Sequence, residues 1–152
     1  MPNWCTNIVE IVSGNDRDLD GVMSLLTDAT EPFALIIPRP DNADAYDWQV
    51  SNWGTKWEAG GFDIHRSGSH IVMNFSTAWS PSVMVTAALA DKFPSLEIRH
   101  LYEEPGMGFT GCARFGEGRQ FSDDCRDITD EESRWNEDGV ENEDFVELSD
   151  RF

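Results

Sequence analysis

The chain has 152 residues, of which 39% are hydrophobic, and this length suits one domain with an additional segment. Its 29 acidic residues outnumber 11 lysines and arginines, and the net charge of −18 argues against direct binding to nucleic acid or to an anionic membrane. The sequence shows no signal-peptide pattern and no apolar run near the roughly 20 residues that span a bilayer, so its three cysteines predict a reduced, cytoplasmic protein.

A strand followed by a helix is predicted first. The β-rich run from Cys5 to Ser13 predicts the strand. Asn15 or Asp16 can cap the helix, which is expected to extend to about Thr27. Its apolar residues recur at helical spacing, namely Leu19, Val22, Met23 and Leu26.

The next region is rich in proline and tryptophan. Residues 33–40 form a short apolar run that Pro38 and Pro40 stop. Residues 41–61 show no period, and we expect an irregular, Trp-rich insertion there.

Residues 62–78 predict a β-hairpin with its turn at residues 67–69. Apolar residues alternate along both arms, as expected for strands with one buried face. On the return arm these residues are Ile71, Met73 and Phe75.

A second helix and two more strands complete the predicted elements. Ser80 is expected to cap the helix with Pro81 at its first position, where the missing N–H costs nothing, and Pro94 ends it. Residues 95–104 alternate as a fourth strand, and residues 109–118 predict a fifth strand that pairs back on the fourth.

The order of these elements is β-α-β-β-α-β with one added strand. That order predicts an α+β protein with a ferredoxin-like antiparallel sheet, two helices on one face and an extra C-terminal strand. The second face of the sheet must then be solvated, or covered by a partner, or covered by the Trp-rich insertion and the end of the chain.

Charge divides the chain into an expected domain, residues 1–121, and an acidic C-terminal tail, residues 122–152. The tail holds 13 acidic residues and 3 arginines, a net charge of −10. Its low apolar content predicts that it cannot order itself independently. Aromatic residues such as Trp135 and Phe145 leave two interpretations open: a solvated tail, or a segment that docks on its own domain or on a partner.

Several short phrases together resemble a known family. They are "MPNWC-N" at Met1–Asn7, "NWGTKW" at Asn52–Trp57, "TAWSP" at Thr77–Pro81, "KFP" at Lys92–Pro94 and "YEEPGMGFTG" at Tyr102–Gly111. This combination is similar to the YubB-type ferredoxin-like domain family of bacterial plasmids and phages, over residues 1 to about 118. The resemblance implies the same fold and carries no catalytic residues with it.

Tryptophans and one lysine are the candidate binding residues of the domain. A cluster of such side chains can seal a sheet face by packing, or it can line a groove for a ligand or partner. Lys56 lies between two indoles in the sequence and can stack on one of them. The candidates are Trp48, Trp53, Lys56, Trp57 and Trp79 in the domain, with Trp135 and Phe145 in the tail.

Histidine and cysteine patterns do not predict a metal or cofactor site. His65 and His70 flank the hairpin turn, but no i,i+4 pair and no CxxC spacing accompanies them. His100 lies in the inward register of its strand and is expected to be a hydrogen-bonded core histidine. Cys5 and Cys112 are expected to be small buried residues in strands.

Two classes of function remain. The favoured hypothesis is a non-enzymatic protein-binding module of a phage or plasmid, whose carboxylates imitate phosphates and block a basic or nucleic-acid-binding host protein, for instance a defence enzyme. The alternative is a small-molecule-binding domain or enzyme with a pocket between the Trp-rich insertion and the sheet. Its first residues to test are Lys56, His65, His70 and Glu103.

Overall fold

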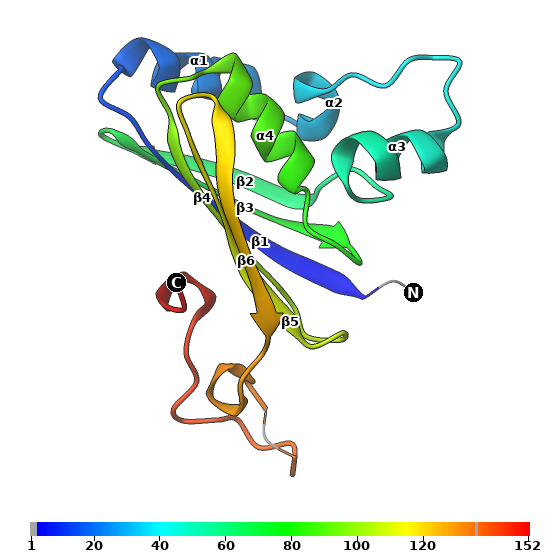
Figure 1. Ribbon diagram of the computed structural model, residues 1–152, viewed down its shortest axis with the longest axis vertical. Coiled ribbons are helices and arrows are strands. Elements are labelled where there is room, and N and C mark those ends of the chain that lie inside the picture. Colours follow the sequence, from blue (N-terminus) through cyan, green and yellow to red (C-terminus); the bar gives the residue numbers. More distant parts are fainter. Residues whose placement is uncertain (1–2, 136) are drawn as a thin grey trace.

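In a computed structural model, which describes residues 3–135 and 137–152, six strands form one antiparallel sheet in the order β2-β3-β1-β4-β5-β6 (Figure 1). Met1 and Pro2 of the first quoted phrase and Asn136 of the tail lie outside the described residues. The strands are β1 (Trp4–Val12), β2 (Gly60–Ser67), β3 (His70–Ala78), β4 (Glu97–Glu104), β5 (Phe109–Gly116) and β6 (Arg119–Asp127).

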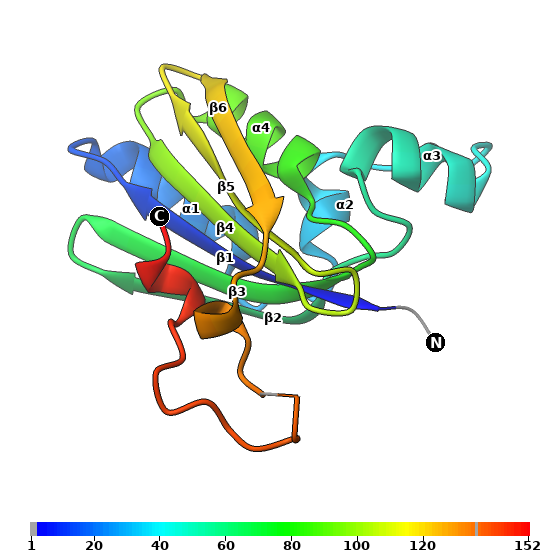
Figure 2. The ribbon, with the colours of Figure 1, turned by 60° about the horizontal axis from the view of Figure 1, so that its bottom comes forward.

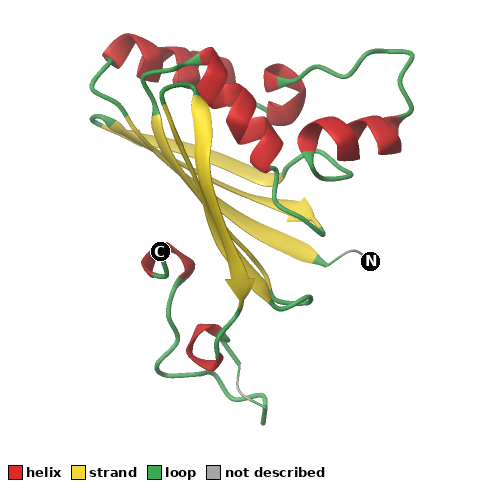
Figure 3. Ribbon diagram, viewed as in Figure 1, coloured by secondary structure: helices red, strands yellow, loops and turns green. Residues whose placement is uncertain are grey.

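The helices gather on one side of this sheet (Figure 3). They are α1 (Asp16–Leu26), α2 (Pro32–Ile36), α3 (Ala45–Trp53) and α4 (Val83–Lys92). The predicted cap of α1 is confirmed, since the Asn15 side chain accepts a hydrogen bond from the Asp18 N–H at 3.2 Å. The main hydrophobic core lies between these helices and the sheet, with fully buried side chains such as Leu19, Ile71 and Leu89.

The predicted fold class is confirmed by the order and pairing of the elements. β1, α1, β2, β3, α4 and β4 follow one another as β-α-β-β-α-β, with β1 paired between β3 and β4. The hairpin of β2 and β3 has the predicted turn, with Ser67 paired to His70. The fifth strand pairs back on the fourth as expected, for example Leu101 with Cys112.

Three local predictions were wrong. The predicted apolar run at residues 33–40 contains a short helix, α2, which begins at Pro32. The insertion is not irregular, because it contains the helix α3. The Asp44 side chain caps α3 by accepting a hydrogen bond from the Asp47 N–H at 3.0 Å. The helix α4 begins at Val83 after the N-cap Ser82, two residues later than predicted. Ser80 cannot cap it because its hydroxyl donates instead to the Gly54 carbonyl at 2.6 Å.

A sixth strand lies where the sequence shows only a charged stretch. β6 pairs with β5 along its whole length, with Asp127 opposite Phe109 at one end and Arg119 opposite Gly116 at the other. The expected domain boundary at residue 121 therefore falls inside a strand. β6 is the edge of the sheet, and all its residues except Ser122 are exposed. A strand exposed on both faces has no alternation of apolar and polar residues, which removes the usual sequence signal.

The end of the tail docks on the second face of the sheet, opposite the helices (Figures 1 and 2). Leu148 packs there against Leu101 and Cys112, with Ile8 and Phe152 beside them. Leu148 belongs to the short 3-10 helix η2 (Leu148–Asp150), and a second one, η1 (Asp130–Glu132), follows β6. Of the two interpretations of the tail, docking on its own domain holds for this part.

Candidate functional site

The tryptophans of the insertion divide into two groups, and the first group packs in the core. Trp53 is 3% exposed, and its indole N–H donates to the Ile37 carbonyl at 3.0 Å. Its ring meets Trp48 edge-on with centroids 5.6 Å apart and Phe33 at 5.7 Å. Such contacts stabilise the insertion against the sheet, so Trp48 and Trp53 act as packing residues in this structure.

The second group forms an exposed cluster, here called the Trp platform, made of Trp4, Lys56, Trp57 and Trp79. Its three indoles are 43–44% exposed. The Lys56 ammonium lies 4.2 Å from the centroid of Trp57 and 6.0 Å from that of Trp79, and Trp4 lies 6.0 Å from Trp57. The predicted stacking of Lys56 on an indole is therefore confirmed. Trp4 joins the platform from β1, a position that the candidate set did not contain.

Two loops fix the platform in place. The Thr55 hydroxyl donates to the Ala78 carbonyl at 2.8 Å, which ties the loop after α3 to the loop after β3. Gly54 ends α3 at φ 79°, and Trp79 adopts φ 70°, which is uncommon for a bulky residue. Because Trp79 also donates its N–H to the Asn3 carbonyl at 2.9 Å, this backbone conformation is held on both sides.

A buried chain of polar side chains runs from α4 towards this loop. The His100 ring accepts or donates at both nitrogens, with Thr86 Oγ1 2.8 Å from Nδ1 and Asn7 Oδ1 2.8 Å from Nε2. The Asn7 amide donates to Thr77 Oγ1 at 2.9 Å, and that hydroxyl donates to the Ser80 carbonyl at 2.6 Å. Since the Asn7 amide nitrogen is used as donor, its oxygen accepts from His100 Nε2–H.

Burial lowers the pKa of His100 to about 3, so the ring is neutral at physiological pH. All of its hydrogen-bonding capacity is satisfied inside the core, which confirms the expected core histidine. Burial also raises the pKa of the Cys5 thiol to about 12 and raises that of Cys112. Neither thiol is then an activated nucleophile at neutral pH.

The residues of the alternative, pocket-based hypothesis do not meet. His65 and His70 are exposed at the turn end of the β2–β3 hairpin, whereas Lys56 precedes the opposite end of β2. Glu103 lies on β4 and pairs with Arg151 of the tail at 2.5 Å. Among residues 3–135 and 137–152, no group of three or more His, Cys, Asp or Glu side chains has a geometry that could hold a metal ion.

One buried acid stands out on β4. Glu104 is fully buried, and neither of its carboxylate oxygens has a hydrogen-bond partner within the described part of the chain. A Cβ built on Gly106 would lie 2.8 Å from its Oε1 and 2.7 Å from the Asn3 amide nitrogen, so a larger residue at position 106 would require these side chains to shift. The Glu104 side chain therefore lies against the β4–β5 turn, and within the described residues it forms no ion pair.

Two arginines anchor the tail through buried carboxylates. Arg151, whose side chain has no exposed surface, pairs with Glu103 at 2.5 Å and with Glu132 at 3.6 Å. Arg126 of β6 binds both oxygens of Glu132, at 2.6 and 2.7 Å. This bidentate pair lowers the pKa of Glu132 to about 2. Arg99 completes the anchor by donating to the carbonyls of Ser149 and Phe152.

A cleft of about 490 Å³ separates the tail from the β4–β5 turn. Pro105 and Ile128 contribute apolar walls, and the two predicted tail residues Trp135 and Phe145 both line it. Trp135 is 58% exposed, and the Arg134 guanidinium lies 4.7 Å from the Phe145 ring. The structure thus brings together two aromatic residues that are ten positions apart, although their binding role stays a prediction.

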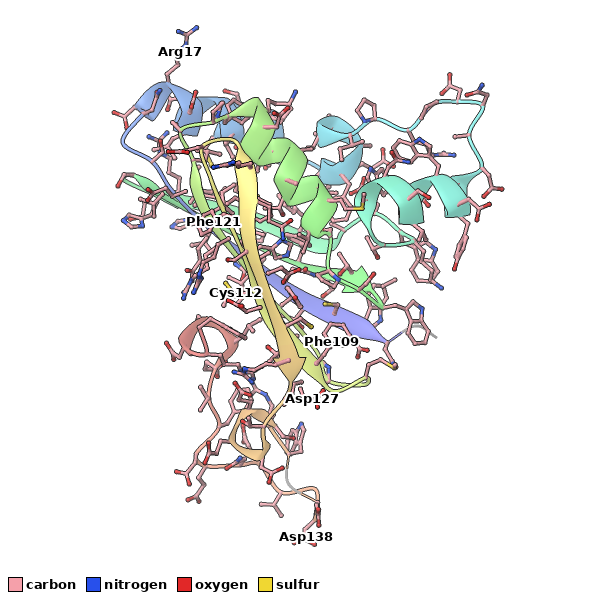
Figure 4. The ribbon with its side chains drawn as sticks, in the orientation of Figure 1. Arg17, Phe109, Cys112, Phe121, Asp127 and Asp138 are labelled. Carbon is pink, nitrogen blue, oxygen red and sulfur yellow. The ribbon has the colours of Figure 1, made fainter. Side chains whose placement is uncertain are left out.

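Exposed carboxylates occur along β6 and the tail, in a segment here called the acidic ribbon and comprising β6, residues 128–135 and residues 137–147. In β6, Asp124 pairs with Cys112 of β5, Asp127 pairs with Phe109, and Asp123 accepts the Tyr102 hydroxyl at 2.6 Å. Figure 4 shows Cys112 and Phe121 on the side of the sheet that carries the docked tail, and Phe109 on the other side. The acidic ribbon therefore borders both faces of the sheet.

The topology and the sheet register define an α+β protein of the ferredoxin-like class with two strands, β5 and β6, added beside β4. Residues 52–146 match the family model described as the ferredoxin-like domain in Api92-like protein, and the chain belongs to this family. The match continues into the acidic tail, beyond residue 118 where the resemblance to YubB-type domains ended. None of the helices in the described residues is long and apolar enough to cross a membrane.

A solved relative has the same fold. The crystal structure of protein api92 from Yersinia pseudotuberculosis superimposes with a TM-score of 0.53 at 20% sequence identity, over 60% of this chain. The superposition spans 38% of the api92 chain, so the relative is the longer protein and the likeness concerns the fold alone. Comparison with curated proteins gives no match.

Proposed function

We propose that this protein is a non-enzymatic protein-binding module that binds a basic protein surface through its acidic ribbon. The observation that carries the proposal is the rigid mounting of the ribbon's carboxylates. The ion pairs of Arg126 with Glu132 and of Arg151 with Glu103 hold η1 and the end of the tail against the sheet, while neighbouring acids stay exposed. Charges fixed in position bind a complementary surface at a smaller entropic cost than charges on a flexible tail.

The finer form of the proposal is nucleic-acid mimicry. Fixed carboxylates at a sheet edge present negative charge in a row, as the phosphates of a nucleic acid do, so a basic or nucleic-acid-binding host protein is the expected partner. The resemblance to YubB-type domains of plasmids and phages supports a host defence protein as the target. The net charge of −18 favours a basic protein as the partner over nucleic acid or an anionic membrane.

The test is capture from a bacterial lysate, followed by binding measurements on each retained protein at low and high salt. A variant with Asp124→Asn, Asp127→Asn, Glu131→Gln and Glu143→Gln neutralises exposed ribbon acids for which no side-chain partner is seen in the described residues. It should weaken binding by about tenfold or more at low salt, because complementary charge drives the association.

The matched control carries Asp28→Asn, Asp41→Asn, Asp63→Asn and Asp91→Asn. It changes the net charge equally at exposed positions away from the ribbon. If both variants weakened binding equally, net charge alone, and not the position of the acids, would explain the effect. A partner that binds as tightly at high salt as at low salt would contradict the mimicry, since exposed charges more than about 10 Å apart are largely screened at 0.1 M salt.

A further inference from the structure

The free edge of β6 has a second property besides its charge. We infer that β6 accepts a basic β-strand of the partner protein by edge-to-edge addition, with an apolar side chain of that strand against Phe121. The inference rests on the proposed function, since charge selects the partner, and it specifies how that partner binds.

The edge is long and uncovered. β6 has nine residues, so it is about 30 Å long at roughly 3.3 Å per residue. Its ladder runs to β5 only, and within residues 3–135 and 137–152 no other segment forms a backbone ladder with it. The outward row of N–H and C=O groups therefore remains available, and such a row is a template for another strand.

Proline and lysine, two residues that often protect an edge strand, are missing from β6, which keeps charged side chains and one bulge. Its sequence, Arg119 to Asp127, contains no proline, glycine or lysine. One bulge interrupts the register at Phe121, because Arg114 of β5 pairs with Ser122 and Phe115 pairs with Gln120. From Ser122 to Asp127 the ladder is regular, so the second half of the edge is the part best suited to pair with a strand.

Charge makes this edge selective. Arg126 is committed to Glu132, so Asp123, Asp124 and Asp127 dominate the regular half of the strand. Like charges directly opposite each other on neighbouring strands destabilise pairing, and opposite charges stabilise it. A second copy of this acidic chain is therefore disfavoured at the edge, and a strand with lysine or arginine at alternate positions is favoured.

Phe121 supplies the apolar part of the contact. Its ring is 64% exposed and lies beside Gly116, where a Cβ would be 3.5 Å from its Cε1. On the same face a groove of about 490 Å³ opens next to it, lined among others by Val12, Arg114 and Phe121. An apolar side chain on the added strand can cover this ring, as cross-strand aromatic and β-branched pairs do in sheets.

The probe is a capped nine-residue peptide that alternates valine with arginine, titrated into the isotope-labelled full chain. Its matched control is the same peptide with N-methyl groups on four consecutive central residues. N-methylation removes donors on both edges of the peptide and leaves charge and side chains unchanged. A third peptide replaces each arginine with serine. Binding is followed by chemical shift changes, and amide hydrogen exchange is measured across residues 119–127.

We expect the unmethylated basic peptide to bind at least about tenfold more tightly than either control peptide. Alternate amides of β6 should exchange more slowly in its complex, because the outward N–H groups become hydrogen-bonded. The Phe121→Ala variant should weaken binding severalfold. The Trp57→Ala variant, which removes an equally aromatic side chain of the distant Trp platform, should leave binding unchanged.

Equal, salt-dependent binding of the methylated and unmethylated basic peptides without protection in β6 would overturn the strand addition and leave the proposed function standing. Equal binding of the serine peptide would overturn the charge selection. If neither basic peptide binds, the strand addition fails. The proposed function fails with it only if basic proteins also show no salt-dependent binding. Self-association of the free chain through β6 in sedimentation experiments would assign the edge to a second copy instead.

Discussion

Burial decides what a titratable or aromatic side chain does in this protein. Trp53 and Trp57 are four residues apart, yet the first is 3% exposed and holds α3 to the core, while the second is 44% exposed in the Trp platform. The histidines differ in the same way, because His100 is buried whereas His65 and His70 are exposed. The same residue type therefore has a structural role at one position and an open, solvent-facing role at another.

Stability should depend on pH through His100. Its pKa is about 3 in the folded chain and near 6.5 when unfolded, so between these values the unfolded state binds one more proton. The free energy of unfolding is therefore not reduced by His100 above about pH 6.5. It falls as the pH decreases further, by about 1.4 kcal/mol between pH 7.5 and pH 5.5. Urea unfolding of the wild type at both pH values measures this loss.

The His100→Gln variant should be less stable at pH 7.5, because it loses the bonds to Thr86 and Asn7, but its stability should change less with pH. The His70→Gln variant, altered at an exposed position, serves as the control and should keep the wild-type dependence. A His100→Gln chain with an undiminished pH dependence would assign the effect to another group.

At the scale of elements, the tail behaves as part of the sheet's second face. Leu148 and Phe152 cover apolar residues of β1, β4 and β5, and the arginine anchors fix the segment around them. Because Arg151 has no exposed side-chain surface, removing its charge leaves Glu103 and Glu132 with one partner fewer in a buried site. Breaking a buried pair in this way is costly, about 3–5 kcal/mol in other proteins.

The Arg151→Met variant should release the end of the tail and uncover Cys112. In the wild type, Cys125 is exposed, whereas Cys5 and Cys112 are buried, so one thiol is expected to react quickly with a thiol reagent. In the variant Cys112 should react at least about tenfold faster, because the opened state is more populated. Mass spectrometry of the labelled peptides identifies which cysteine has reacted.

The Arg134→Met variant is the matched control. Arg134 is half exposed, and its ion pairs with Glu141 and Glu147 are longer, at 3.6 and 3.8 Å. Exposed pairs of this kind contribute little, so Cys112 should stay protected. Slow labelling of Cys112 in Arg151→Met would mean that apolar packing of Leu148 and Phe152 holds the tail without the arginine.

For the whole molecule, the net charge of −18 produces a destabilising electrostatic field. Most of the acids are exposed and have few basic neighbours, so their mutual repulsion opposes the compact state. Added salt screens this repulsion over distances longer than the Debye length, which falls from about 30 Å at 0.01 M to about 3 Å at 1 M. The buried pairs of Glu132 and Arg151 are screened much less.

The melting temperature should therefore rise by about 3 °C or more between 0.01 M and 0.5 M sodium chloride, as a gain of roughly 1 kcal/mol gives in a chain of this size. Calorimetry in both buffers measures the shift. The variant with four ribbon acids neutralised should show a smaller rise than the wild type. A melting temperature that falls with salt would mean that the internal ion pairs outweigh the repulsion.

The sequence by itself determined the elements that carry a period. Alternation in residues 70–78 and helical spacing in residues 16–26 follow directly from one-sided burial, so the ferredoxin-like order, the hairpin turn and the inward placement of His100 were predictable. The tertiary structure alone decided what has no period. β6 is a strand only because its backbone pairs with β5.

The same reason explains the parts of the candidate site that the sequence did not reveal. The partner of Arg151 on β4 is 48 residues away, and no local pattern links Arg151 to Glu103. Trp57 and Trp79 meet Trp4 only because β1 and β3 pair with Trp4 opposite Ala78. Local spacing encodes which face of an element is buried, whereas contacts between distant exposed and charged residues depend on how the elements pack together.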